Sequence, residues 1–217
     1  MSKRFSGNDL VCVRGERTVF ERLSFSIGDG DALVLRGPNG SGKSSLLRIM
    51  AGLLHLESGE LLWNGLDVTQ DLHLHRTGLH YVGHQNALKP LLTVTENLAF
   101  AASIRSAETR CCDALEAFAL ANLAELPVRL LSAGQRRRLA LARLVASPAS
   151  LWLLDEPTTS LDEDAVAMLQ SVVSSHRARG GIVVLAVHGT LAMEAPTELD
   201  ISNFSPRGGA MPEPAPS

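Results

Sequence analysis

The sequence contains few cysteines. Its 217 residues include three of them, and Cys12 stands alone while Cys111 and Cys112 are adjacent. Because no C-x-x-C pair is present, the spacing indicates neither a zinc site nor a redox motif. We therefore expect all three side chains to be small, buried or half-buried hydrophobic groups.

No hydrophobic run is long enough to cross a bilayer. A transmembrane helix needs about 18 or more consecutive apolar residues, whereas the run at 182–187 is bounded by Gly181 and His188. Residues 1–10 contain two basic side chains with no apolar segment after them, unlike a secretory signal. We therefore expect a cytoplasmic chain, with no direct membrane span of its own.

A surplus of positive charge is absent as well. The formal net charge is -3, whereas proteins that bind duplexes normally carry more Lys and Arg than Asp and Glu. Nucleic acid is therefore disfavoured as a partner. The apolar fraction of 45% and the charged fraction of 20% are those of a globular domain.

The first part of the chain is expected to be rich in strands. Apolar runs separated by Gly and Asp predict strands at 10–13, 23–27 and 32–36. A helical pattern follows at 44–54. The dipeptide Asn64-Gly65 lies between apolar flanks within 60–68, and this pattern predicts a β-hairpin.

The rest of the chain predicts helices and parallel strands. Thr93-x-x-Glu96 has the pattern of a capping box and opens a helical stretch over 93–124. The runs 151–154 and 181–187 have the length of strands buried on both faces, with a helix over 162–178 between them, which predicts a βαβ unit. We expect one domain over 1–205 with a helical lobe inserted at about 87–147, and a loose Pro/Gly-rich tail at 206–217.

A glycine-rich motif lies between the expected strand at 32–36 and the expected helix at 44–54. It fits G-x-x-x-x-G-K-[ST], in which glycines let the backbone curl around phosphates and the helix N-terminus adds partial positive charge. We expect Lys43 to reach the β and γ phosphates of a nucleotide and Ser44 to ligate Mg²⁺. The phosphate loop comprises Gly37, Pro38, Asn39, Gly40, Ser41, Gly42, Lys43, Ser44 and Ser45.

Two carboxylates, Asp155 and Glu156, follow the apolar run 151–154. They would lie at the carboxyl end of a strand, where open α/β sheets hold ligands. We expect Asp155 to hold Mg²⁺, directly or through water, and Glu156 to polarise the attacking water as a general base. Strands often end in acidic turns, so this pattern indicates chemistry only in combination with the phosphate loop.

A third motif is Leu131-Ser132-Ala133-Gly134-Gln135, which precedes a helical run. Ser132-x-x-Gln135 is a capping-box pattern that leaves the helix start exposed and electropositive, which suits a phosphate presented by another molecule. With the phosphate loop and the Asp-Glu strand, this pentapeptide resembles the signature of the ATP-binding-cassette family. That signature is usually LSGGQ, so Ala133 is a small departure.

The resemblance implies an α/β fold of the P-loop NTPase type, with a mixed β-sheet core, an N-terminal antiparallel β subdomain and an inserted α-helical subdomain. It also implies ATP hydrolysis with Mg²⁺ in a head-to-tail dimer, in which the signature 132–135 of one copy covers the ATP bound by a second copy. In that family Gln85 would sense Mg²⁺ and the transport partner. His188 would contact the γ phosphate, and the segment 160–162 would connect the two sites.

Other stretches resemble the branch of this family that serves heme export in bacterial cytochrome c maturation. They lie at 16–18, 23–25, 83–85, 92–98, 131–143 and 180–183. This resemblance implies separate membrane-spanning subunits, a peripheral place on the cytoplasmic face of the inner membrane, and coupling through 85–90. The cargo step would be heme export or release of a heme-loaded chaperone.

Two alternatives stay open at this point. The first is a cassette ATPase for a different cargo, since the cargo depends mainly on the membrane partner. The second is a soluble cassette ATPase that acts on DNA or ribosomes. Such proteins normally carry a long coiled-coil insertion or a second cassette, and the sequence shows neither.

Three features have competing interpretations. The run Arg136-Arg137-Arg138 fits an anion site, but a solvated helix face is favoured. Arg14 stands where the family usually has an aromatic residue that stacks on adenine. Metal or heme ligation by histidines would need a spacing template, which is not met. The histidines concerned are His73, His75, His80 and His84, while Trp63 and Trp152 are expected in the core.

Overall fold

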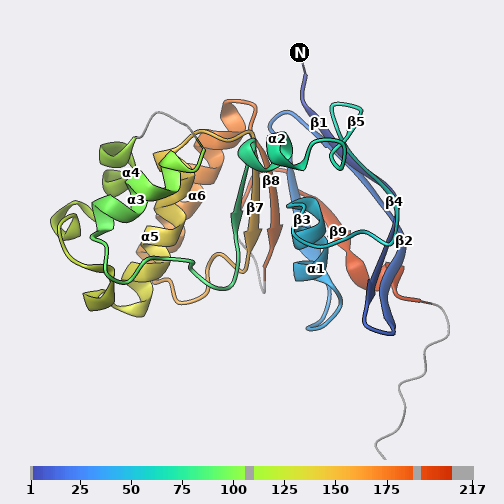
Figure 1. Cartoon of the computed structure of the whole chain (residues 1–217), viewed down its shortest axis with the longest axis horizontal. Coiled ribbons are helices and arrows are strands. Elements are labelled where there is room, and N and C mark those ends of the chain that lie inside the picture. Colours follow the sequence, from blue (N-terminus) through green and yellow to red (C-terminus); the bar gives the residue numbers. More distant parts are fainter. Residues whose placement is uncertain (1, 106–109, 188–191, 207–217) are drawn as a thin grey trace, which may run out of the picture.

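A computed structural model describes residues 2–105, 110–187 and 192–206. Two sheets lie beside a group of helices (Figure 1). One sheet has four strands in the order β2-β1-β4-β5, and the other has five in the order β6-β7-β8-β3-β9. The predicted fold class is confirmed, with the antiparallel strands in one sheet and the parallel strands in the other.

The antiparallel sheet is built from the N-terminal part of the chain. Its strands are β1 (Arg4–Arg14), β2 (Arg17–Gly28), β4 (Ser58–Trp63) and β5 (Leu66–Asp67). Asn64 and Gly65 have φ angles of 53° and 81°, as a two-residue hairpin turn requires, and the predicted hairpin is confirmed. β1 and β2 extend well beyond the predicted apolar runs, because their pairing continues through polar residues on the solvent side.

The parallel sheet forms the centre of the molecule. Its strands are β3 (Ala32–Arg36), β6 (Leu79–Val82), β7 (Leu151–Asp155), β8 (Ile182–Ala186) and β9 (Thr197–Asp200). All residues of β7 and β8 are buried, and the two strands pair in parallel as predicted. β9 was not predicted, because three of its four residues are exposed and no apolar run marks it.

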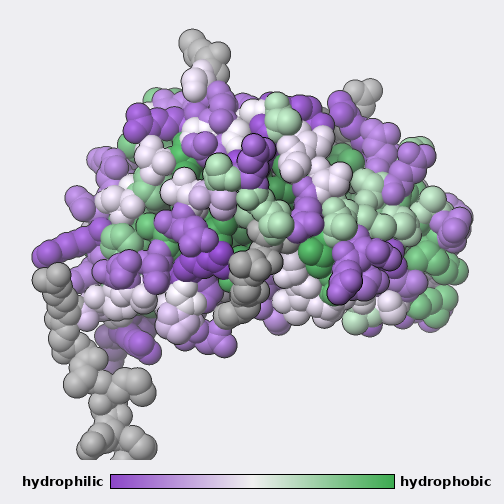
Figure 2. Space-filling view, turned by 180° about the vertical axis from the view of Figure 1, so that it is seen from behind, coloured by the Kyte–Doolittle hydropathy of each residue, from purple (hydrophilic) through white to green (hydrophobic). Residues whose placement is uncertain are grey.

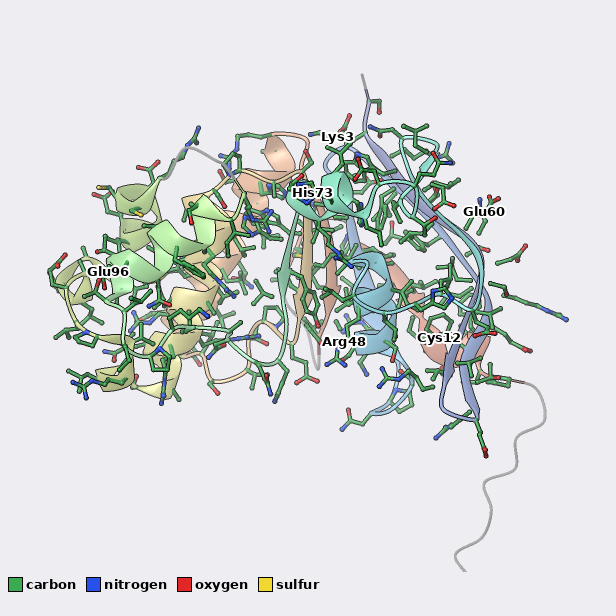
Figure 3. All side chains as sticks on the ribbon, viewed as in Figure 1. Lys3, Cys12, Arg48, Glu60, His73 and Glu96 are labelled. Atoms are coloured by element: carbon green, nitrogen blue, oxygen red, sulfur yellow. The ribbon has the colours of Figure 1, made fainter. Side chains whose placement is uncertain are left out.

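The helices divide between the two sides of the parallel sheet. They are α1 (Lys43–Met50), α2 (Leu72–Thr77), α3 (Val94–Ser103), α4 (Cys111–Ala117), α5 (Ala133–Ala146) and α6 (Glu163–Ala178), with 3-10 turns η1 (Ala121–Leu123), η2 (Val128–Leu130) and η3 (Ile201–Phe204). Both predicted capping boxes are present. Glu96, labelled in Figure 3, belongs to the box that begins α3.

Two hydrophobic clusters fill the interior, one on each face of the parallel sheet. Because side chains alternate along a strand, Leu153 of β7 belongs to the cluster shared with α1 and the antiparallel sheet. Trp152 and Leu154 belong to the cluster shared with α3 to α6. Trp152 is therefore in the core as predicted, whereas Trp63 is only partly buried beside the first cluster.

The cysteines depart from the prediction at one position. Cys12 is buried and Cys111 is half-buried, but Cys112 is exposed. Cys111 and Cys112 begin the short helix α4, and successive helical residues point about 100° apart. One of two adjacent side chains therefore faces the neighbouring helices while the other faces solvent.

The helical end of the molecule carries hydrophobic side chains at its surface, as the rear view shows (Figure 2). The large exposed ones in this region are Leu91, Phe100, Ile104, Leu126 and Leu130. None of the helices in the described ranges combines the length and the apolar character that a membrane span needs. A surface of this kind is typical of a region that contacts another protein.

Replacing a core side chain of β7 tests the assignment of the central strand. Leu153 is fully buried, so Leu153→Ala should lower the free energy of unfolding by about 2–5 kcal/mol. Leu74→Ala, at a position 68% exposed on α2, is the matched control and should change it little. Urea unfolding measures both, and equal effects of the two substitutions would contradict the assignment.

Candidate functional site

The phosphate loop joins the end of β3 to the start of α1. Gly42 has a φ of 106°, in the left-handed region that glycine adopts without steric cost. A Cβ atom on Gly42 would lie 2.6 Å from Cγ1 of Val19, so only glycine fits there. The resulting cleft has a volume of about 340 Å³ and is lined by Val19, Asn39, Gly40, Gly42, Lys43, Ser44, Ser45 and Glu156.

Lys43 is held inside this loop. Its side chain belongs to a residue only 6% exposed, and Nζ donates hydrogen bonds to the carbonyl oxygens of Gly37 at 2.7 Å and Pro38 at 2.9 Å. Ser41 Oγ is buried and has no hydrogen-bond partner among the residues that the structure describes. Buried polar atoms are normally paired by hydrogen bonds. A loop that holds the Lys43 ammonium group and leaves the Ser41 hydroxyl group unpaired therefore fits a phosphate group.

Ser44 and Asp155 meet although they are far apart in the sequence. Ser44 Oγ donates a hydrogen bond to Asp155 Oδ1 at 3.0 Å. Asp155 is 2% exposed at the end of β7; burial raises the pKa of its carboxyl group, and the hydrogen bond from Ser44 opposes that shift. Two adjacent oxygen ligands, one of them a carboxylate, are the donor set that Mg²⁺ prefers, so these residues fit that ion.

Glu156 lies beside the same cleft in an unusual conformation. Its φ angle is 48°, which is uncommon for a residue with a side chain and is typical of functional sites. Its backbone nitrogen donates to Ala186 O at 2.8 Å, which anchors the turn to the end of β8. His84 Nδ1 lies 4.0 Å from Oε2 of Glu156. A carboxylate in this place can accept a proton from water beside a bound phosphate.

The signature residues form a closed local structure. Ser132 Oγ accepts a hydrogen bond from Gln135 N at 3.2 Å, and Gln135 Oε1 accepts one from Ser132 N at 2.8 Å. A Cβ atom on Gly134 would lie 3.2 Å from Ser160 O, so this helix start is close to the segment 160–162. Within the described part of the chain, the signature 132–135 does not line the cleft around the phosphate loop. One copy alone does not bring the two motifs together.

The remaining predicted site residues either do not line the cleft or lie outside the described residues. Gln85 is exposed on the segment that follows β6. His188 and the tail from 207 onward lie outside the described residues. Arg14 is exposed at the end of β1 and is not among the residues that line the cleft.

Two of the four histidines, His75 and His80, have structural surroundings, whereas His73 and His84 are exposed. His75 Nε2 is 2.7 Å from Met50 O, and His80 Nε2 is 2.9 Å from Ser147 O. Burial lowers the pKa of His80 to about 3, and the nearby charge of Arg105 adds to that shift. His73 lies on α2 (Figure 3). Across the described ranges no three or more potential ligand side chains form a metal cluster.

The prediction of a solvated arginine run is wrong for one member. Arg136 is exposed and Arg138 is half-buried, but Arg137 is only 3% exposed. On a helix, the middle residue of three faces the protein interior when its neighbours face outward. Its guanidinium reaches carbonyl oxygens on two other segments, so it is neither a solvated group nor an anion site.

Sequence reasoning also missed two neighbours of the phosphate loop. Val19 of β2 packs against Gly42, and Asp200 at the end of β9 lies 3.4 Å from a Cβ atom built on Gly37. Hydrogen bonds from Ser202 lower the pKa of the Asp200 carboxyl group. No motif in the sequence marks either residue, since their positions follow from strand pairing.

Comparison with known proteins agrees with this geometry. The sequence profile for ABC transporters matches residues 20–159. A protein of Rhodospirillum rubrum named Cytochrome c biogenesis ATP-binding export protein CcmA is 52% identical over 93% of this chain and 87% of its own length. A protein of the same name from Paramagnetospirillum magneticum is 50% identical over 93% of this chain and 95% of its own length.

A solved structure supports the fold. A putative ABC transporter ATP-binding protein from Pyrococcus furiosus superimposes with a TM-score of 0.81 at 23% identity, covering 94% of this chain and all of its own. Sequence, fold and the arrangement around Lys43, Ser44 and Asp155 thus agree. This chain belongs to the ABC transporter family, as one of its ATP-binding subunits, and within it to the group of ATP-binding export proteins of cytochrome c biogenesis.

Proposed function

We propose that the chain is the ATP-hydrolysing subunit of a transporter complex that couples hydrolysis to heme export, or to release of a heme-loaded chaperone, in cytochrome c biogenesis. The observation that carries the proposal is the convergence of Lys43, Ser44, Asp155 and Glu156 at one cleft. The name shared by the relatives supports the biological setting. Residues 1–205 would act as one cassette, with the helical lobe inserted at about 87–147.

Each residue of the cleft has a distinct part in the proposed reaction. Backbone amides of the phosphate loop bind the phosphates of ATP, and Lys43 exchanges its contacts with loop carbonyls for the β and γ phosphates. Ser44 and Asp155 would hold Mg²⁺, together with Gln85, and the ion would supply positive charge that neutralises the phosphates. Glu156 accepts the proton of the attacking water. His188 contacts the γ phosphate.

The active unit in this proposal is a head-to-tail dimer. The start of α5 at Ser132 is exposed and capped only by its own residues, while the cleft at Lys43 is open. A second copy can therefore present its signature 132–135 to the γ phosphate of the first. The partial positive charge of a helix N-terminus favours a phosphate there.

A docking face for membrane-spanning subunits is proposed at the helical end. Leu91 is 81% exposed and Leu130 is 63% exposed. Their segments lie side by side, since Arg129 N donates to Pro90 O at 2.9 Å. The adjoining cleft of about 410 Å³ is lined by Asn86, Leu88, Pro90, Arg129 and Arg136, among others. Contact here would place the chain peripherally, on the cytoplasmic face of the bacterial inner membrane.

Purification from the native membrane tests the cargo assignment. Membrane-spanning subunits that bind heme or a heme chaperone should be recovered with the tagged chain under mild detergent. Recovery with subunits that recognise another solute would show that the transporter complex carries a different cargo. Recovery with ribosomes or DNA and no membrane protein would refute the transporter proposal.

Removing the proposed general base gives the sharpest test of the reaction. Glu156→Gln keeps the size of the side chain but cannot accept the proton, so turnover should fall by about a hundredfold or more. ATP binding should persist, and the variant should accumulate as an ATP-bound dimer. Steady-state hydrolysis and light scattering with Mg-ATP measure the two effects.

The matched control for this variant is Glu163→Gln. Glu163 is exposed in the first turn of α6, so its substitution removes the same charge away from the cleft. It should leave turnover unchanged and should not accumulate the ATP-bound dimer beyond the wild-type level. Unaltered turnover in Glu156→Gln would rule out the proposed base.

Coupling through the segment 85–90 is tested by reversing a charge. Lys89 is exposed, and its Nζ lies 5.3 Å from the ring centre of Phe100, away from the phosphate loop. Lys89→Glu should retain basal hydrolysis but lose most of the stimulation by the co-purified membrane subunits in proteoliposomes. Full stimulation in that variant would show that docking involves another surface.

A further inference from the structure

The buried guanidinium of Arg137 is completely satisfied by hydrogen bonds. Arginine has five N–H groups in a planar fork. The acceptors are Pro157 O for Nε at 3.2 Å, Gly83 O at 2.9 Å and Asn86 Oδ1 at 3.1 Å for Nη1, and Asp155 O at 3.1 Å and Glu156 O at 2.7 Å for Nη2. Each N–H group thus has one acceptor.

These acceptors are all neutral oxygens. Within the described residues Arg137 makes no ion pair. Burial lowers the pKa of its guanidinium group, and the nearby carboxylates of Asp155 and Glu156 only partly oppose that shift. A buried cation is costly unless its donors are paired. Retaining one here indicates that the directions of its five bonds matter, and a lysine ammonium offers only three donors on one atom.

Three of the acceptors belong to one short turn. The carbonyl oxygens of residues 155–157 bracket Glu156, whose φ angle of 48° is uncommon for a residue with a side chain. Bonds to the carbonyls on both sides of that residue hold the turn in this conformation. The direction in which the Glu156 carboxylate leaves the backbone is therefore set in part by Arg137.

The other two acceptors belong to a different segment. Gly83 and Asn86 flank His84 and Gln85 on the stretch that follows β6. Arg137 itself lies on α5, the helix that begins at the signature. One guanidinium thus joins the acidic turn, the segment 83–86 and the signature helix.

We propose that Arg137 is a positioning residue for ATP hydrolysis, which fixes the orientation of Glu156 and ties it to the position of the segment 83–86. The inference rests on the proposed role of Glu156 as general base. Arg137 is not among the residues that line the nucleotide cleft. Its loss should therefore affect the hydrolytic step and leave nucleotide binding intact.

Two substitutions test the five-bond arrangement. Arg137→Lys keeps the charge but cannot span the acceptors, and misplacement of Glu156 should lower kcat by about ten- to a hundredfold. Asn86→Ala removes one acceptor and should lower kcat by a smaller factor. The Kd for ATP, measured in the absence of turnover, should stay within about twofold in both, the signature of a transition-state effect.

The matched control is Arg138→Gln. Arg138 is the next residue on α5. Among the described residues its Nη1 donates one hydrogen bond, to Phe118 O at the end of α4 at 3.4 Å, and none to the acidic turn. It should leave kcat unchanged. Thermal unfolding of all variants shows whether the fold is retained; a kcat loss in Arg137→Lys accompanied by an equal loss of ATP affinity would indicate a general structural role and overturn the proposal.

A double-mutant cycle separates this inference from the function on which it rests. If Arg137 acts through Glu156, adding Arg137→Lys to Glu156→Gln should lower single-turnover hydrolysis no further than Glu156→Gln alone. The positioning role is refuted if Arg137→Lys lowers the hydrolysis rate by the same factor in the wild-type protein and in Glu156→Gln. It is also refuted if Arg137→Lys and Asn86→Ala both keep the wild-type kcat. Wild-type hydrolysis by Glu156→Gln alone would instead refute the proposed base.

Discussion

The hydrogen bond between Ser44 Oγ and Asp155 Oδ1 is the contact on which the site depends. It joins residues 111 positions apart at a distance of 3.0 Å. The contact exists because the carboxyl ends of β3 and β7 meet at one edge of the parallel sheet, where each strand pairs with β8. Parallel strands bring their carboxyl ends together by construction, so the phosphate loop and the acidic turn become neighbours only when the sheet is complete.

Around that contact, the polar groups of the site find only some of their binding partners within their own chain. Within the described residues, Lys43 Nζ donates its hydrogen bonds to two carbonyl oxygens and none to a carboxylate, and Ser41 Oγ has no hydrogen-bond partner. The start of the signature helix is capped by its own residues and does not line the cleft. Each of these features is reasonable for a site completed by a phosphate and by a second copy, and each would be a defect in a site complete within one chain.

Sequence reasoning located those parts of the site that depend on local chemistry. The phosphate loop, the capping box at Ser132 and the buried strand before Asp155 all follow from short patterns whose physical requirements are contained in a few consecutive residues. β9 and the contact of Val19 with Gly42 were missed, because an exposed edge strand has no hydrophobic period and a packing contact between distant segments leaves no local pattern. For the same reason, no local pattern in the sequence predicted where Arg14 lies relative to the cleft.

Arg137 shows most clearly where such reasoning fails. A run of three arginines is expected on a solvated face, because a buried charge normally needs an opposite charge beside it. Here four backbone carbonyls and one amide oxygen replace the missing carboxylate. Three of those carbonyls are available because the chain leaves β7 through a turn with a left-handed residue at Glu156. The strained turn and the buried cation therefore stabilise each other, and neither is visible in the sequence without the other.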